Sequence, residues 1–240
     1  MADAPLPAVR PPELVYRVAR GLDVFAPPDW AYALPDGTFG NRFDDPSADR
    51  GVPEGERYRA IYCATERAGA FGETIARFRP SIELLAGLEA IEDDEPLDPE
   101  LRGGVVPEEW RLSRRVGSTR LASSLLFADL PAPKTMRILR EELAVVAKEL
   151  GLEDLDLSAV TGPHRRLTQE AARYVYDLND PSGQPIFAGI RYISRLNPTW
   201  ELWAVFHDRM RHEPGEVAEP IRADDPGLVE AAALLGLSVE

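Results

Sequence analysis

A single carboxylate stands on a helix face made otherwise of very small residues, in the segment YRAIYCATERAGAFGE from Tyr58 to Glu73. This segment predicts a short strand that runs directly into a helix. At the helical period one side is an apolar stripe of Ala68, Phe71, Ile75 and Phe78, and the other side consists of Gly69, Gly72, Glu73 and Ala76. Two glycines inside a helix cost roughly 1 kcal/mol each relative to alanine, so the pattern favours a bulky group close to the backbone beside the acid. A solvated glutamate on an exposed helix face is the competing interpretation.

Two arginines lie inside strand-like stretches upstream of this glutamate. Arg17 is embedded in the apolar run LVYRVA, and Arg42 follows a glycine and an asparagine in FGNRF. Arginine is rarely buried unless it is paired, and its planar fork matches phosphate oxygens. The pair therefore suits a pyrophosphate ligand. The alternative for each arginine is an ion pair with one of the many acidic residues of the chain.

Two further polar residues occur in apolar strand contexts. Tyr62 lies in AIYCA, where its ring offers a stacking surface with a polar tip, and Ser194 ends the run GIRYIS. A glutamate near a ribose can hold a hydroxyl or stabilise developing positive charge. Five residues therefore form the candidate site: Arg17, Arg42, Tyr62, Glu73 and Ser194.

Familiar catalytic and metal-binding motifs are missing from the sequence. It contains no dinucleotide-binding glycine pattern, no P-loop lysine pattern and no nucleophile elbow. The three histidines lack the spacing of a helical zinc site. The single cysteine, Cys63, excludes a disulfide within the chain, and its apolar strand context indicates a buried thiol. We therefore expect no metal.

Composition limits the classes of partner. The chain has 240 residues, and 27 basic against 41 acidic side chains give a formal charge of −14. Such a field repels phosphate backbones, so the chain alone is not expected to bind nucleic acid, although a small anion can still bind where arginines gather. No signal-peptide pattern and no apolar run of about 18 residues occur, so we expect a cytoplasmic protein without membrane contact.

The elements that must position the candidate residues alternate irregularly. Scattered strands and separate helices indicate an α+β fold rather than a regular βαβ series. The predicted strands cover 14–19, 39–43, 57–64, 186–195 and 203–206, with strand-like pieces between 110 and 126 (WRLSRRV, LASSLLF); the predicted helices cover about 65–78, 81–88, 134–150, 168–178 and 227–235.

An ordered set of short runs resembles the RES domain, a family named for an arginine, a glutamate and a serine. The runs are YRV at 16–18, GNRF at 40–43, AIYCA at 60–64 with Glu73 after it, and GIRYISR at 189–195. The resemblance covers about residues 14–210. It predicts a loose N-terminus at 1–12, a RES domain at 13–212 with an acidic insertion at about 80–109, and a C-terminal extension with a short helix at 213–240.

The resemblance implies both a fold and an activity. The fold is an ADP-ribosyltransferase-like split β-sheet core with flanking helices. Characterised members are toxins of type II toxin–antitoxin systems that consume NAD⁺ as substrate, cleaving its nicotinamide–ribose bond by hydrolysis or phosphorolysis. Carried over by position, the catalytic residues are Arg42, Tyr62, Glu73 and Ser194, and the NAD⁺-binding residues are Arg17 and Arg42, with Tyr16 and Tyr58 as weaker candidates.

The resemblance also implies partners and leaves alternatives open. The implied partners are NAD⁺, inorganic phosphate as an acceptor, and a cognate antitoxin protein. One alternative is transfer of ADP-ribose to a macromolecule. Another is a catalytically silent, partner-binding RES-like protein whose functional surface is the loop 44–56 and the acidic insertion. Whether the chain forms a homo-oligomer is left open.

Overall fold

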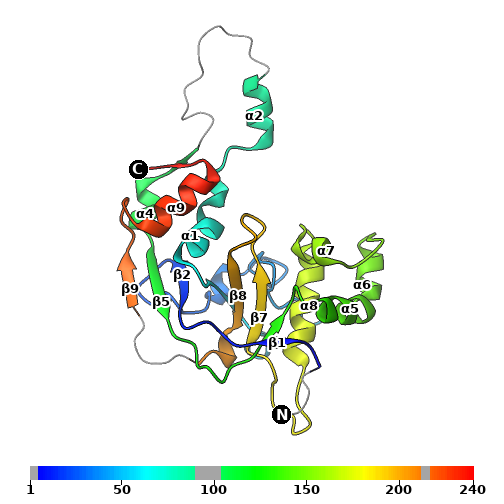
Figure 1. The fold of residues 1–240 in the computed structure, drawn as a ribbon. Coiled ribbons are helices and arrows are strands. Elements are labelled where there is room, and N and C mark those ends of the chain that lie inside the picture. The colour runs from blue at the N-terminus through cyan, green and yellow to red at the C-terminus, as the bar shows by residue number, and fades with distance from the viewer. Residues whose placement is uncertain (1–4, 90–103, 212–216) are drawn as a thin grey trace.

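A mixed eight-stranded sheet runs through the computed structural model, which describes residues 5–89, 104–211 and 217–240 (Figure 1). All neighbouring strands in this sheet are antiparallel except β6 and β7, which are parallel. In spatial order the strands are β1 (Ala8–Val9), β6 (Phe127–Asp129), β7 (Gly189–Ile193), β8 (Glu201–Phe206), β3 (Ala60–Ala64), β2 (Val15–Ala19), β5 (Arg115–Thr119) and β9 (Val217–Pro220).

Helices flank the sheet at both ends, and a small parallel pair joins β4 (Val105–Val106) to β10 (Ser238–Val239). Figure 1 shows α1, α4 and α9 near the end that carries β5 and β9, α5 to α8 near β7, and α2 projecting away from the sheet. The helices are α1 (Arg67–Ile75), α2 (Ile82–Glu89), α4 (Glu108–Leu112), α5 (Pro133–Glu142), α6 (Ala144–Glu149), α7 (Leu157–Thr161), α8 (Arg165–Asp177) and α9 (Pro226–Leu235). The predicted α+β fold is confirmed.

The sheet is split between β2 and β3. Only Tyr16 and Ala64 face each other as partners across this pair, whereas β2 shares five partner pairs with β5 and β3 shares five with β8. The two strands therefore separate after a single residue pair. This is the split core that the sequence predicted, and the candidate site opens at this point.

Each face of the sheet packs into its own hydrophobic cluster, because side chains alternate along a strand. Tyr62 and Ala64 lie in the larger cluster together with the buried side of α1, whereas Ile61 and Cys63 lie in the smaller cluster on the opposite face. On α1 the predicted apolar side is confirmed for Ala68, Phe71 and Ile75, which are buried; Phe78 is half-buried in a 3-10 turn at Ala76–Phe78.

The strand predicted over 39–43 is wrong. These residues form a turn, because Asp44 Oδ2 accepts hydrogen bonds from the amides of Phe39 (2.9 Å) and Asn41 (2.7 Å). Gly40 adopts a positive φ of 73°, a conformation that a strand does not contain. The turn presents Arg42 from a compact loop instead of from a sheet edge.

The single helix predicted over 134–150 is two helices. Leu143, with φ −104° and ψ 15°, separates α5 from α6. Leu139, Leu143 and Ala147 are nevertheless all buried, so the apolar spacing runs through the break without revealing it.

The strand-like pieces predicted between 110 and 126 are largely wrong. Trp110 lies in α4, which begins after Pro107 with two glutamates in its first turn, where the helix dipole favours acids. Only Arg115 and Val116 of WRLSRRV belong to a strand, β5, and LASSLLF is a connection that reaches β6 only at Phe127. The other predicted elements lie within three residues of those observed.

The segments outside the predicted core domain are partly integrated into it. The N-terminal residues predicted to be loose include β1, which pairs with β6. Residues 217–240 add β9 to the sheet edge, and α9 packs against α1. Most of the predicted acidic insertion, 90–103, lies outside the described residues. No helix in the described ranges is long and apolar enough to cross a membrane.

Candidate active site

A cleft of about 470 Å³ opens where β2 and β3 separate. Its walls come from these two strands, from one side of α1, from the turn at 41–42, from the first residue of α8, and from the chain around the end of β7. Its charged and aromatic lining residues include Arg17, Arg42, Tyr62, Glu73, Arg165 and Arg195.

Glu73 lines this cleft and is held by Ser194, which lies behind it and is not part of the cleft lining. Ser194 Oγ donates a hydrogen bond to Glu73 Oε1 at 2.6 Å, although the residues are far apart in sequence. The same Oγ accepts from the amides of Leu196 (3.0 Å) and Asn197 (3.5 Å), and Ser194 is buried. Because a hydroxyl has one proton and two lone pairs, these three contacts fix its orientation and leave its proton to Glu73. Glu73 itself is exposed, so its carboxylate faces the open cleft.

Gly69 and Gly72 make room for protein at this position. A Cβ on Gly72 would overlap the indole of Trp200, and one on Gly69 would lie 3.3 Å from Cγ of the same ring. The bulky group predicted beside the acid is therefore Trp200, which packs under α1 and is buried. Gly69 also lines the cleft.

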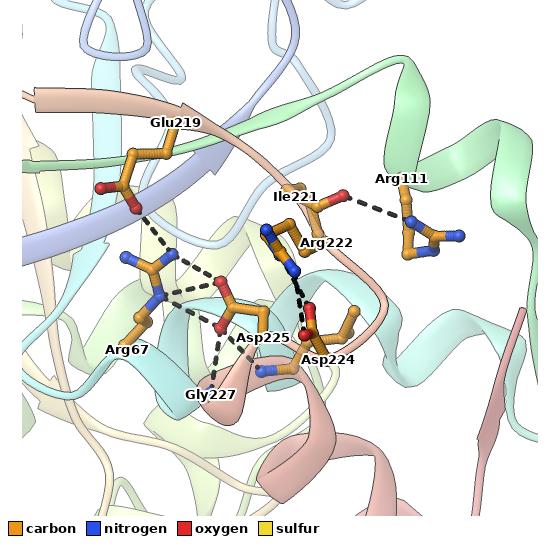
Figure 2. Close-up of polar contacts among 9 residues, drawn as sticks. Arg67, Arg111, Glu219, Ile221, Arg222, Asp224, Asp225 and Gly227 are labelled. Carbon is orange, nitrogen blue, oxygen red and sulfur yellow. Dashed lines mark hydrogen bonds and ion pairs between the residues drawn. The ribbon is translucent and has the colours of Figure 1, made fainter.

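The first turn of α1 is anchored by the C-terminal segment (Figure 2). Arg67 pairs with the buried Asp225 at 2.5 Å and with Glu219 at 3.1 Å. Asp225 also caps α9 by accepting from the amides of Gly227 and Leu228. Gly227 lies so close to Arg67 and Ala68 that a side chain there would collide with them. These contacts fix the helix on which Glu73 stands.

Tyr62 is held by the turn that carries Arg42. Its hydroxyl donates to Asp44 Oδ1 at 3.3 Å and accepts from the amide of Phe43 at 2.9 Å. Burial, reinforced by the Asp44 charge, raises the pKa of Tyr62 well above its usual value, so the hydroxyl stays neutral. Burial also raises the pKa of Asp44, against the hydrogen bonds that it accepts. Tyr62 therefore presents its ring to the cleft and uses its hydroxyl to position the Arg42 turn.

Arg17 carries a buried donor without a partner. Its Nη1 atom makes no hydrogen bond with any described residue. Burial lowers the pKa of Arg17, and the nearby Cys63, Tyr62 and Asp23 oppose this shift. A buried donor that lacks an acceptor costs free energy, so this part of the fold is not satisfied by the described residues alone.

Three more arginines surround Glu73. Arg42 lies 5.9 Å from the centre of the Tyr192 ring, and burial lowers its pKa; Arg195 and Arg165 act in the same direction, whereas Tyr192 and Glu73 oppose them. Within the described ranges, no carboxylate forms an ion pair with any of these three arginines. The cleft therefore concentrates unpaired positive charge in a chain whose formal charge is −14.

Sequence reasoning missed Arg165 and Arg195. Arg165 is the first residue of α8, and Arg195 immediately follows Ser194. Arg195 could have been found from its place at the end of the run GIRYISR. Arg165 had no such signal, because only the tertiary packing of α8 brings it to the cleft.

The two weaker candidates lie outside the cleft lining. Tyr16 is half-buried against the larger cluster. Tyr58 is buried, with its ring 4.6 Å from the rings of both Tyr176 and Phe206, and its hydroxyl donates to the Asp44 carbonyl. Their predicted role in binding has no support from this placement. No group of three potential metal ligands occurs among the residues that the structure describes.

Comparison with known proteins gives one family and one solved structure. The family model described as RES domain matches residues 14–224. A chain in the crystal structure of the M. tuberculosis MbcT-MbcA toxin–antitoxin complex is similar at 14% identity and a TM-score of 0.42, over 88% of this chain and 86% of that one. The search of curated proteins finds no match.

Proposed function

This chain belongs to the RES domain family, and from that premise we propose that it cleaves the nicotinamide–ribose bond of NAD⁺. The observation that carries the proposal is the carboxylate of Glu73, oriented by Ser194, in a cleft whose other charged lining residues are all arginines. A carboxylate in this position suits a reaction centre that becomes positive, whereas the arginines suit the phosphates of the same substrate.

The chemistry follows from the charges. As the glycosidic bond breaks, its electron pair moves to the nicotinamide nitrogen, and the ribose carbon becomes oxocarbenium-like. Glu73 stabilises that developing positive charge electrostatically. A nucleophile then bonds to the ribose carbon: water, which loses a proton, or inorganic phosphate. Ser194 keeps the carboxylate in place, and Tyr62 offers its ring to the nicotinamide end of the substrate.

The number of arginines favours phosphate as acceptor. The pyrophosphate of NAD⁺ carries two negative charges, and Arg17 with one further arginine suffices to pair with them. The cleft contains four arginines, Arg17, Arg42, Arg165 and Arg195, so positive charge remains for a second anion. Water needs no such charge. We therefore expect added phosphate to accelerate nicotinamide release and to appear in the ribosyl product.

The test is nicotinamide release from NAD⁺ by the purified chain, with and without phosphate. Glu73→Gln keeps the side-chain volume and removes the charge, so we expect kcat to fall by roughly 100-fold or more. Equal rates for wild type and Glu73→Gln would refute the assignment. Label from NAD⁺ that stays on a macromolecule would instead favour ADP-ribose transfer, and NAD⁺ binding without turnover would favour a silent protein.

We further propose that the chain acts as a toxin held in check by a cognate antitoxin. Family membership supports this role, because NAD⁺ loss is harmful to a cell. Expression of the wild type should arrest growth and deplete NAD⁺, whereas Glu73→Gln should do neither. Co-expression of a protein encoded beside this chain should restore growth through a complex that co-purifies. Growth arrest by both variants alike would separate toxicity from NAD⁺ cleavage.

A further inference from the structure

A second cavity, of about 520 Å³, lies in the loop that follows β2. Its lining includes Arg20, Asp23, Asp29 and Tyr32, together with the apolar pair Pro27–Pro28. Arg17 lines this cavity as well as the cleft that holds Glu73, and it is common to both linings. Arg17 therefore lies at the boundary between the two cavities.

The polar groups of the second cavity suit a nucleotide. Arg17 and the exposed Arg20 can hold phosphate oxygens. Asp23 accepts the amide of Phe25 and Asp29 accepts the amide of Ala31, each through Oδ1. No hydrogen bond from a described residue occupies the Oδ2 atom of either aspartate, so both can accept from ribose hydroxyls.

The exposed aromatic ring of Tyr32 lies at the edge of the second cavity. Tyr32 lies in the 3-10 turn Trp30–Tyr32, and 79% of its surface is exposed. The neighbouring Trp30 stacks on Phe39 with ring centres 5.3 Å apart and lies under the guanidinium of Arg57 at 4.6 Å. Arg59 also donates to the Pro28 carbonyl at 2.9 Å.

These contacts fix the turn without using the Tyr32 ring. The ring therefore remains available as a preorganised surface on which a planar base can stack, and loss of such a stack weakens binding appreciably.

We propose that the second cavity binds the adenosine monophosphate half of the dinucleotide, with the base on Tyr32 and the phosphate on Arg17 and Arg20. This inference rests on the proposed function, because it places the two halves of one substrate on either side of Arg17. The reacting nicotinamide half then lies in the cleft with Glu73. The partnerless guanidinium at the boundary holds the pyrophosphate that joins them.

The first experiment measures AMP binding by calorimetry and needs no turnover. We expect Tyr32→Ala to weaken AMP binding about tenfold, the size of one lost base-stacking contact, whereas Tyr32→Phe keeps the ring and the affinity. Leu22→Ala is the matched control, because Leu22 is 77% exposed in the same loop and does not line the cavity. It should bind AMP as the wild type does.

The second experiment compares NAD⁺ with nicotinamide mononucleotide, which lacks the adenosine monophosphate half. The ratio of the two kcat/KM values measures how much that half contributes. Tyr32→Ala should lower this ratio about tenfold through the KM for NAD⁺, and Leu22→Ala should leave it unchanged.

The outcomes separate this inference from the proposed function. Absence of AMP binding to the wild type, or equal binding by wild type and Tyr32→Ala, overturns the inference. If nicotinamide is released but the ratio does not respond to Tyr32→Ala, the inference fails and the proposed function stands. If AMP binding depends on Tyr32 but no nicotinamide is released, the proposed function fails and the cavity remains a nucleotide site.

Discussion

At the scale of residues, the site combines one carboxylate with several arginines that lack acidic partners. Glu73 is exposed, so a ligand can reach its carboxylate. A hydrogen bond from the buried Ser194 holds that carboxylate in one orientation. Arg165 and Arg195 reach the same cleft from α8 and from the chain after β7. The positive charge of the arginines favours an anionic ligand, and the negative charge of Glu73 favours a reaction centre that becomes positive.

Arg165→Ala and Arg195→Ala test the anion sites of the cleft. Each variant removes one unpaired charge, so we expect the KM for NAD⁺ or for phosphate to rise about tenfold, with the folded state unchanged. Arg166→Ala is the matched control, because Arg166 neighbours Arg165 but pairs with Glu149 at 2.7 Å and does not line the cleft. Steady-state kinetics would show the difference; similar effects of Arg165→Ala and Arg166→Ala would argue against a local role.

Cys63 should make the unfolding free energy depend on pH in the alkaline range. Burial raises the pKa of its thiol to about 12 from 9.0, and the charge of Arg17 only partly opposes this shift. Because the folded pKa is raised, the stabilisation is complete below the unfolded pKa and is lost as pH rises towards the folded pKa. As pH rises from about 9 towards about 12, the wild type should therefore lose unfolding free energy faster than Cys63→Ala. Chemical denaturation at several pH values would measure this, and parallel curves would contradict it.

At the scale of elements, α1 is positioned from three sides. Trp200 packs under its glycines, β3 leads into it, and α9 packs against it. The helix carries Glu73 near its C-terminal end. Changes at the buried side of α1 should therefore affect stability and the site together.

Gly72→Ala tests the contact with Trp200. The added Cβ would overlap the indole, so we expect a loss of roughly 1–3 kcal/mol in unfolding free energy, although alanine is the better helix former. Gly87→Ala in α2 is the control, because nothing lies within 4 Å of the position that its Cβ would take. That variant should be neutral or slightly stabilising. Equal destabilisation of both variants in denaturant titrations would count against steric overlap at Gly72.

The sequence predicted helices and strands better than it predicted which distant residues lie close together in the folded protein. The 3.6-residue period located α1, and the resemblance selected Arg17, Arg42, Tyr62 and Glu73, which share one cleft. The break at Leu143 escaped detection because buried residues continue through it. The strand predicted at 39–43 does not form, because the Asp44 side chain accepts hydrogen bonds from backbone amides and holds these residues in a turn. Arg165 reaches the site only through the packing of α8. Tertiary contacts of this kind leave no periodic trace in a sequence.

At the scale of the whole molecule, the C-terminal segment closes the fold. Beyond the Arg67–Asp225 pair, Arg111 donates to the carbonyl of Ile221 (Figure 2). Arg111 also donates to the carbonyl of Glu240, and β10 pairs with β4. Residues 217–240 therefore connect the sheet edge to the helix that carries Glu73.

Asp225→Ala tests this anchor. It removes the buried partner of Arg67 and the cap of α9, so we expect a loss of roughly 3 kcal/mol in unfolding free energy and a lower kcat through misplacement of α1. Asp224→Ala is the neighbouring control; Asp224 pairs with Arg222 on the exposed surface, where ion pairs contribute little. Thermal unfolding and nicotinamide release would be measured for both. Similar behaviour of the two variants would show that the anchor is not needed.

The long-range pairing of β3 with β8 and of α1 with α9 has a consequence for protein synthesis. The partners of the two elements around Glu73 follow them at a large separation in the sequence: β8 pairs with β3, and α9 packs against α1. A growing chain on the ribosome therefore contains Glu73 long before it contains Ser194 or the helix that fixes α1. If the proposed function holds, cleavage of NAD⁺ should begin only after Ser194 and α9 have been synthesised and have packed against α1.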